Sequence, residues 1–324
     1  MSAVLCEIRT PTYNRPRLLE RALRSLQAQT HTGWVCRVFD DSTDEAAASL
    51  CRALNDPRIL YTKNPARQGA RGNIDQCFAR AGLPGSTHFF VLEDDNYVLP
   101  QFIAANLATM AQSDAPVLLR NQRKEAYAPD DADGPLLDET CLEGLFTEGC
   151  WPATLARTGL LYGIGLSNGG LFWSAAARSD FETRLVTSNP ALDEYLRAWL
   201  IRDRVHVAMH PLAVWRDNGP DSSRPTQGTM GVFLRNQRAL QKLRRAVYDD
   251  AIAAAGPEAV TGGHLAVPAA DREAALARLV RPWPGPAALP LARKSNLIAK
   301  GVLLSAAPCV PGIAAFMRAR PLEA

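Results

Sequence analysis

The sequence predicts an α/β fold in which helices flank a mostly parallel sheet, with a helical tail at the C-terminus. Hydrophobic residues make up 47% of the 324 residues, which is enough to bury a core. Short apolar runs alternate with helical patterns as far as Gln112, as they do in βαβ units. Polar residues gather at the carboxyl ends of the predicted strands, where such sheets bind ligands, at Thr10–Asn14, Asp40–Asp44 and Glu93–Asn96.

Four strand–helix pairs make up this first part of the chain. The predicted strands are Val4–Arg9, Trp34–Phe39, Ile59–Tyr61 and His88–Leu92. The helices that follow them are predicted at Arg17–Gln29, Asp44–Leu54, Gly69–Ala81 and Gln101–Gln112. The first helix has the clearest pattern, because its apolar residues recur at the spacing of one helical face, at Leu18, Leu19, Ala22, Leu23 and Leu26.

The alternation weakens after a short predicted strand at Val117–Leu119. Ala128–Asp138 is rich in Pro, Asp and Gly and predicts a loop, and Gly159–Gly170 is dense in glycine. Next we expect a strand, a helix, a strand, a mobile polar loop and a long helix, at Leu171–Trp173, Ala191–Leu200, Val205–Trp215, Asp217–Gly231 and Gly231–Ala255. We therefore divide the chain into three parts, at residues 1–115, 116–235 and 236–324.

The charge is small overall but uneven along the chain. A net charge of +3 does not suggest a nucleic-acid binder, which needs a strongly basic face. Ala274–Leu322 has no acidic residue and seven basic ones, so this tail either docks on an anionic membrane surface or folds back on the acidic remainder. Gly301–Met317 is uncharged, but it is too short and too rich in proline for a predicted transmembrane helix.

Several local motifs are excluded by their spacing. The seven cysteines contain no Cys-x-x-Cys pair, and the N-terminus lacks a signal-peptide pattern, so we expect a cytoplasmic protein with reduced thiols. The cluster Gly163–Gly169 misses a dinucleotide-binding fingerprint by one residue. His206 and His210 share one face of a predicted strand, and a structural role is the simpler interpretation because no third metal ligand is evident.

Two pairs of adjacent acids carry the chemistry that the sequence offers. Asp94 and Asp95 follow an apolar strand, where two carboxylates repel each other unless a cation or hydrogen-bond donors compensate them. Such oxygen ligands suit Mg²⁺ or Mn²⁺ held together with phosphates, and the alternative is a solvated acidic turn. Asp40 and Asp41 end another strand, where they either accept hydrogen bonds from a nucleoside or cap the following helix.

Four stretches resemble, in order, the motifs in the N-terminal half of family-2 glycosyltransferases. They are TPTYNRPRLLERALRSLQAQT, VFDDSTDE, QGARGN and FFVLEDDNYVLP, and they lie within about residues 4–102. The resemblance implies a GT-A fold, which has a mostly parallel, Rossmann-like sheet. It also implies that the protein transfers a sugar from a nucleotide-diphosphate donor.

The resemblance assigns five residues to the nucleotide. Thr12 and Tyr13 match the loop that packs on the base, and Asp40 and Asp41 match the acids that read uracil. Arg71 matches the basic residue that lies near the base and the diphosphate. The expected donor is therefore a UDP-sugar.

The same resemblance separates the roles of the two acids after the fourth strand. Asp94 is expected to bind the ribose, and Asp95 is expected to bind the Mn²⁺ or Mg²⁺ ion that bridges the diphosphate. A divalent ion neutralises the charge that develops on the leaving diphosphate without any proton transfer. The role of Glu93 is left open, because the family varies at that position.

The second half resembles the family more loosely. Asn168–Gly170 matches a glycine-rich segment on the acceptor side, and Asp193 and Glu194 match an acidic helix start that supplies the general base. An inverting transfer needs one carboxylate to take the proton of the acceptor hydroxyl, and we favour Asp193 over Glu194 for this role. The competing interpretation is that both acids only stabilise the positive end of their helix.

One position departs from the family. After the late strand the family often has Tyr-Arg-x-His, whose histidine can join the metal, whereas this chain has Trp215-Arg216-Asp217-Asn218. Either Asp217 or Asn218 substitutes for that histidine, or the metal has no third protein ligand.

These expectations define an inverting, metal-dependent glycosyltransferase of polysaccharide biosynthesis. Its partners are a UDP-sugar donor and a glycan or lipid-linked acceptor, without nucleic acid. It is expected in the cytoplasm, either free or peripheral on the cytoplasmic face of a membrane. The alternative is a nucleotide-sugar-binding pseudoenzyme or assembly subunit that retains the donor site. A nucleotidyltransferase is disfavoured, because no glycine-rich triphosphate loop with a lysine follows the first strand.

Overall fold

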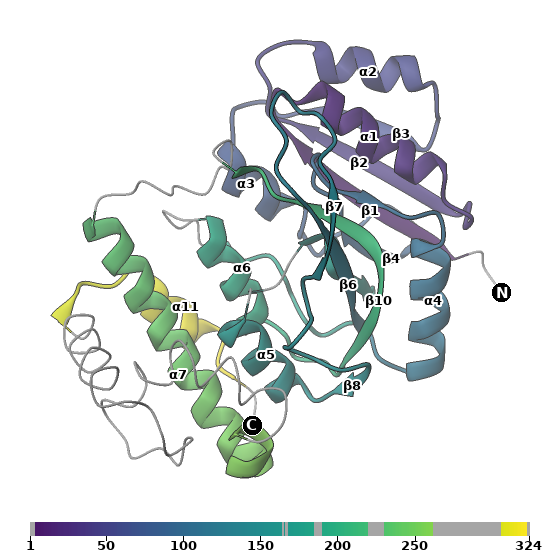
Figure 1. The fold of residues 1–324 in the computed structure, drawn as a ribbon. Coiled ribbons are helices and arrows are strands. Elements are labelled where there is room, and N and C mark those ends of the chain that lie inside the picture. The colour runs from purple at the N-terminus through teal and green to yellow at the C-terminus, as the bar shows by residue number, and fades with distance from the viewer. Residues whose placement is uncertain are drawn as a thin grey trace.

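A computed structural model describes residues 4–163, 165, 168–184, 190–219, 230–261 and 306–322. Its central feature is a ten-stranded sheet with the strand order β3-β2-β1-β4-β9-β6-β10-β5, in which β7 adds to β6 and β8 adds to β10. Helices cover both faces of this sheet (Figure 1). The predicted α/β class is therefore confirmed.

The N-terminal part of the sheet is parallel, as the alternation predicts. Its strands are β1 (Leu5–Thr12), β2 (Trp34–Asp40), β3 (Ile59–Lys63) and β4 (Ser86–Val91). The helices that connect or follow them are α1 (Pro16–Gln27), α2 (Ala46–Leu54), α3 (Gly69–Gln76) and α4 (Phe102–Ser113). Because parallel strands end at one edge, this arrangement brings the loops after β1 and β4 together.

The remaining strands extend the sheet and add antiparallel pairs. They are β5 (Tyr97–Val98), β6 (Val117–Glu125), β7 (Leu136–Thr140), β8 (Gly149–Trp151), β9 (Leu171–Ser174) and β10 (Val205–Arg216). β10 runs parallel to β6, whereas β9 lies antiparallel between β4 and β6. The later helical elements are α5 (Ala153–Tyr162), the 3₁₀ turn η1 (Asn168–Gly170), α6 (Pro190–Trp199), α7 (Met230–Thr261) and α11 (Ile313–Ala319).

Two hydrophobic cores lie on opposite faces of the sheet. Successive strand residues point to opposite faces, so Phe89 and Val91 enter one core while Phe90 and Leu92 enter the other. The first core packs against α5, α6, α7 and α11, and the second packs against α1, α2 and α4 (Figure 1). The sheet is thus buried on both sides, which explains why the strand β4 reads as a continuous apolar run.

Two predicted boundaries in the first half were wrong by three residues or more. β1 continues to Thr12, three residues beyond the predicted end at Arg9. It pairs with β4 only as far as Arg9 but with β2 as far as Thr12. Pro11, which has no N–H group to donate, is tolerated in the strand because β4 does not pair with it there. α3 ends at Gln76 rather than at Ala81. The buried Arg9 guanidinium collects the carbonyl groups that follow the helix, those of Cys77, Ala79 and Ala81.

The second half contains elements that the sequence did not predict, among them β7 and α5. The last residues of the predicted loop Ala128–Asp138 open strand β7, which pairs antiparallel with β6. The helix α5 was missed because Gly159 and Gly163 obscure its pattern. Most of the polar loop Asp217–Gly231 lies outside the described residues, as do residues 164, 166 and 167 of the segment Gly159–Gly170.

The described end of the tail folds back on the body. Ile313 and Phe316 of α11 are buried in the same core as α6, and Trp199 Nε1 donates a hydrogen bond of 2.8 Å to the Arg320 carbonyl. Residues 262–305, which carry most of the basic tail, lie outside the described residues. Within the part that is described, no helix has both the length and the apolar character needed to cross a membrane.

Candidate functional site

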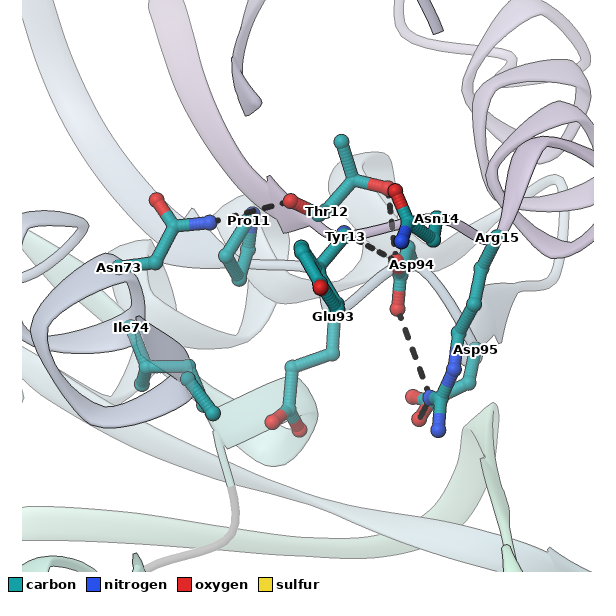
Figure 2. A pocket seen from close by; sticks show the side chains of 11 residues that line it. Pro11, Thr12, Tyr13, Asn14, Arg15, Asn73, Ile74, Glu93, Asp94 and Asp95 are labelled. Carbon is teal, nitrogen blue, oxygen red and sulfur yellow. Dashed lines mark hydrogen bonds and ion pairs between the residues drawn. The ribbon is translucent and has the colours of Figure 1, made fainter. Parts of the chain in front are cut away.

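A cavity of about 400 Å³ opens where β1 and β4 end beside α3 (Figure 2). It is lined by Pro11–Arg15, by Ala70, Asn73 and Ile74 of α3, and by Glu93–Asp95. Its size lies within the range of small-molecule and cofactor sites. The sequence-predicted residues Thr12, Tyr13, Asp94 and Asp95 all line it.

The turn after β1 is shaped by Asn14. This residue has a φ of 53°, a left-handed conformation that asparagine tolerates better than most residues. Its backbone N–H donates to Ser42 Oγ at 2.8 Å, which ties the turn to the loop after β2. Pro16 then starts α1 at a position that suits proline. The turn therefore holds Tyr13 and Arg15 at the mouth of the cavity.

Asp94 is held by the end of β1. Thr12 Oγ1 donates to Asp94 Oδ2 at 2.7 Å, and the Tyr13 N–H lies 3.4 Å from the same oxygen (Figure 2). Burial, and then the neighbouring Asp95 carboxylate, raise the pKa of Asp94 to about 7. Thr12 thus holds the Asp94 carboxyl, and its predicted contact with the nucleobase stays a prediction.

A single carboxylate oxygen of Asp95 contacts both a guanidinium group and a side-chain amide. Arg15 Nη1 lies 3.0 Å from Asp95 Oδ2, and Asn218 Nδ2 donates to the same oxygen at 2.6 Å. Arg21 Nη2 donates to the Asp95 backbone carbonyl at 2.7 Å. The sequence analysis named Asn218 as a possible substitute metal ligand, but it did not predict that Arg15 and Arg21 contact Asp95. These contacts depend on the packing of the start of α1 beside the loop after β4, which the sequence does not show.

Tyr13 presents an aromatic face near the cavity. Its ring is 37% exposed, and the Arg67 guanidinium lies 4.6 Å from the ring centroid. An exposed ring with a neighbouring guanidinium can stack on a nucleobase. The predicted contact of Tyr13 with the base stays a prediction.

Asp40 is committed to partners within the protein. The fully buried carboxylate accepts hydrogen bonds from the Ser42 N–H at 2.8 Å and the Tyr61 hydroxyl at 2.8 Å, and Lys63 Nζ lies 3.2 Å away. Burial opposes ionisation, but the hydrogen bonds from Ser42, Tyr61 and Lys63 outweigh it and lower the pKa of Asp40. Asp40 does not appear among the cavity-lining residues, and its role toward uracil remains a prediction.

Asp41 caps the start of α3. Its two carboxylate oxygens accept the N–H groups of Gln68 at 2.8 Å and Gly69 at 2.7 Å, and Asn64 Nδ2 donates to it at 3.1 Å. The sequence left open whether Asp40 and Asp41 cap the helix that follows them. Asp41 does cap a helix, but this helix is α3 and not α2, which follows β2 directly. The predicted contact between Asp41 and the base is likewise still a prediction.

The stretch Gln68–Asn73 contains the predicted site residue Arg71 and the buried residue Asn73. Arg71 lies half-buried on α3 and is not among the cavity-lining residues. Asn73, at the end of the same motif, is buried, and its amide donates to the carbonyl groups of Thr12 at 3.2 Å and Phe39 at 3.0 Å. Asn73 thereby joins the ends of β1 and β2 to α3, a function that its position in the motif did not reveal.

Asp193 and Glu194 lie on different faces of α6. Asp193 is 4% exposed and precedes Arg197 by one helical turn, so the two share a face. Arg197 reaches α3, where its guanidinium lies 3.1 Å from Asp75 Oδ1. Glu194 packs beside Gly165, because a Cβ atom placed on that glycine would come within 3.0 Å of Glu194 Cβ. Neither acid is among the cavity-lining residues.

The oxygen donors at the cavity fit a divalent cation that also binds phosphate. Among the described residues, no group of three or more His, Cys, Asp or Glu side chains is placed to hold a metal ion. Mg²⁺, however, commonly uses only one or two carboxylates together with substrate phosphates. Asp95 already attracts the positive charge of Arg15, and Asn218 adds an amide that can offer its oxygen instead.

The comparisons with known proteins bear on the family resemblance and on the fold. Residues 8–130 match the model of glycosyl transferase family 2. The chain is 31% identical over 110 residues to WcaA of Escherichia coli strain K12, which is named for a glycosyl transferase of colanic acid biosynthesis. That match covers 33% of this chain and 38% of WcaA.

Solved structures show the same fold over nearly the whole chain. Residues 1–349 of TarS from S. aureus superpose with a TM-score of 0.58 at 14% identity, covering 98% of this chain and 81% of that structure. The structure of TarS 1–349 in complex with UDP-GlcNAc gives a TM-score of 0.51 at 13% identity, covering 94% and 74% of the two chains. The chain thus has a GT-A fold, and its resemblance to family-2 glycosyltransferases is confirmed.

Proposed function

We propose that this protein is an inverting glycosyltransferase that moves a sugar from a UDP-sugar to a hydroxyl group of a glycan or lipid-linked acceptor. The observation that carries the proposal is the carboxylate pair Asp94–Asp95 in a cavity at the end of β4, within the segment that matches family 2. Residues 1–115 would bind the donor, residues 116–235 the acceptor, and residues 236–324 would form the tail.

Several features support a nucleotide-sugar donor. The fold is shared with TarS 1–349, which has been solved in complex with UDP and with UDP-GlcNAc. The cavity combines the exposed ring of Tyr13 with the two acids at its other side. We assign the base to Tyr13, the ribose to Asp94 and the diphosphate to the Asp95 side, while Asp40, Asp41 and Arg71 shape the loop around the base.

The diphosphate would be bound together with Mn²⁺ or Mg²⁺. Asp95 would hold the ion, and Asn218 would turn its amide oxygen toward it. When bound, the ion would stabilise the negative charge that develops on the leaving diphosphate. Arg15, which pairs with Asp95 at 3.0 Å, would release the carboxylate and direct its guanidinium to a phosphate oxygen.

The base of the reaction would be Asp193. The face of α6 that carries it is fixed against α3 by the buried pair of Arg197 and Asp75. A carboxylate at this place can take the proton of an acceptor hydroxyl while the nucleotide leaves from the opposite side of the sugar. Glu194, which packs beside Gly165, would have the lesser role.

A donor panel tests the proposal directly. The protein is mixed with several UDP-sugars and matching GDP-sugars, with Mn²⁺ or with a chelator, and both the unfolding temperature and the release of nucleotide are measured. Binding to the folded state raises the unfolding temperature, so a UDP-sugar with Mn²⁺ should give the largest rise. Nucleotide release should follow the same preference. Stabilisation without any release, across a panel of acceptors, would instead favour a binding subunit.

The tail is proposed to contact an anionic membrane surface through residues outside the described part. Its Ala274–Leu322 segment has seven basic residues and no acidic one. A full chain and a truncation after residue 256 would be compared for sedimentation with anionic vesicles. Equal binding by the two chains would contradict the membrane role.

A further inference from the structure

A cysteine, a histidine and a glutamate meet at the amino end of β10. Cys150 of β8 is the direct partner of His206 across the antiparallel pair of strands. Cys150 Sγ lies 3.4 Å from His206 Nδ1, and the other ring nitrogen, Nε2, lies 3.5 Å from Glu148 Oε1. The imidazole therefore stands between a thiol and a carboxylate, which is the order of nucleophile, base and orienting group in activated nucleophiles.

This cluster is remote from the donor cavity. His206 lies near the start of β10, whereas Arg216 ends the strand and Asn218, just beyond it, contacts Asp95. At about 3.3 Å per residue, the two ends of the strand are roughly 30 Å apart. A change at Cys150 therefore leaves the proposed reaction site intact, and the cluster stands independently of the proposed function.

Cys150 differs from the other six cysteines of the chain. It is exposed, whereas five of the others are buried and Cys309 is half-buried. Burial raises the pKa of Cys6, Cys36, Cys51 and Cys77, which keeps these side chains protonated and unreactive. Cys150 combines an accessible thiol with a neighbouring base.

The base is itself held in place. The His206 side chain is 15% exposed, and Glu148 accepts the Met209 N–H through Oε2 at 2.5 Å, which leaves Oε1 facing the imidazole. A neutral imidazole whose Nε2–H points to Glu148 presents the unprotonated Nδ1 to the thiol. Another charged group near the thiol is Arg204, which donates to the Ser113 carbonyl that Cys150 Sγ also approaches.

We propose that Cys150 is a thiol-modification site that forms mixed disulfides with small disulfides, with His206 as its base and Glu148 as a positioning residue. His206 Nδ1 takes the thiol proton as Sγ attacks one sulfur of the disulfide. The sulfur–sulfur bond of the reagent breaks, and its leaving thiolate recovers the proton from His206. One disulfide is consumed and one is formed, so the exchange requires no additional oxidant.

The full-length chain is tested with 5,5′-dithiobis(2-nitrobenzoate) and with glutathione disulfide at neutral pH. We expect one thiol per chain to react in a fast phase, and peptide mapping should place the mixed disulfide on Cys150. Cys150→Ser should remove the fast phase. A fast phase that maps to Cys309 or to a buried cysteine overturns the proposal.

The role of the base is tested by variants of the cluster. A free thiol is only a few per cent thiolate at neutral pH, so His206→Gln should slow the reaction about tenfold. His210→Gln, four residues along the same strand, is the matched control and should react like the parent. Glu148→Gln, at a side chain that is 60% exposed, should slow the reaction about threefold without disturbing the interior.

A measurement at high pH separates proton removal from simple accessibility. At high pH, hydroxide ion can take the proton of a thiol in place of the imidazole, so the two variants should approach the rate of the parent. If the substitutions instead reduced the exposure of the Cys150 thiol, both variants would react slowly at every pH. Rates in both variants that equal the parent at neutral pH, or that stay slow at high pH, contradict the assigned roles.

Discussion

The proposed donor side, residues 1–115, and the proposed acceptor side, residues 116–235, are fixed by different kinds of contact. On the donor side, side chains at strand ends bind neighbouring loops, as Thr12 binds Asp94 and Asn73 binds the Phe39 carbonyl. On the acceptor side, buried arginines join distant helices: Arg157 binds Asp250 of α7, and Arg197 binds Asp75 of α3. The proposed donor side thus relies on polar side chains at strand ends, and the proposed acceptor side on buried arginines that pair with acids of neighbouring elements.

This difference has a physical consequence. Taking a charged group out of water is costly, so a buried arginine that loses its partner destabilises the fold. A carboxylate that lines the cavity, in contrast, would serve a ligand under the proposed function, and we expect it to contribute little to stability when the ligand is absent. We therefore expect substitutions on the donor side to abolish binding with little loss of stability, and substitutions of the acceptor-side ion pairs to do the reverse.

The largest effect is expected from Asp95→Ala on the donor side. It should lower Mn²⁺-dependent transfer by at least about 10³-fold, because a metal-bound diphosphate supplies several kcal/mol of charge stabilisation. The affinity for UDP with Mn²⁺ should fall with it, as measured by calorimetry. Asp114→Asn, at an exposed position whose left-handed φ of 50° suits asparagine, is the control and should behave like the parent. Undiminished dependence of UDP binding on Mn²⁺ in Asp95→Ala would refute the metal assignment.

The next effect separates the two acids of α6. Asp193→Asn should reduce turnover by roughly 10²–10⁴-fold while donor affinity stays close to that of the parent. Glu194→Gln should reduce turnover much less, because its side chain lies on the face that packs beside Gly165. Turnover at saturating donor and the dissociation constant for UDP distinguish these effects. If Glu194→Gln were inactive and Asp193→Asn active, the general base would be Glu194 and not Asp193.

The third effect tests the ion pairs of the acceptor side. Arg157 is 1% exposed and lies 2.7 Å from Asp250, so Asp250→Ala should lower the free energy of unfolding by about 3 kcal/mol. UDP affinity should not change. Asp249→Ala, at the exposed neighbouring position, should stay within about 0.5 kcal/mol of the parent. Chemical denaturation of the three proteins measures the difference, and equal stabilities would show that Arg157 finds other partners.

The contrast between local patterns and contacts over long sequence separations explains what the sequence could reveal. The parallel strands, the cavity-lining residues Tyr13 and Asp94, and the acid Asp95 follow from local periodicity and from motifs at strand ends. The capping of α3 by Asp41, in contrast, joins residues more than twenty-five positions apart. The pairing of Arg197 with Asp75 spans a still longer separation. Contacts of this kind leave no periodic signal, so the antiparallel strands, α5 and the partners of the buried arginines had to come from the structure.

The smallest effect concerns the pH dependence of stability, and it isolates Asp94 on the donor side. Its folded-state pKa of about 7 exceeds the value of about 3.9 expected in the unfolded chain. Between these values the folded state binds more protons, so the contribution of Asp94 to stability falls as the pH rises toward 7. Asp94→Asn keeps an oxygen that can accept from Thr12 but removes the charge. Its Tm in the ligand-free protein should exceed that of the parent by roughly 2–5 °C near pH 8. That advantage should shrink as the pH falls through 7 and vanish only below about pH 4, where the Asp94 carboxyl of the parent is protonated in the folded and the unfolded chain alike. Because the other titrating groups are common to both proteins, the difference between the two Tm curves reports on Asp94. A difference that is independent of pH between these limits would show that the cavity does not hold this carboxyl in its neutral form.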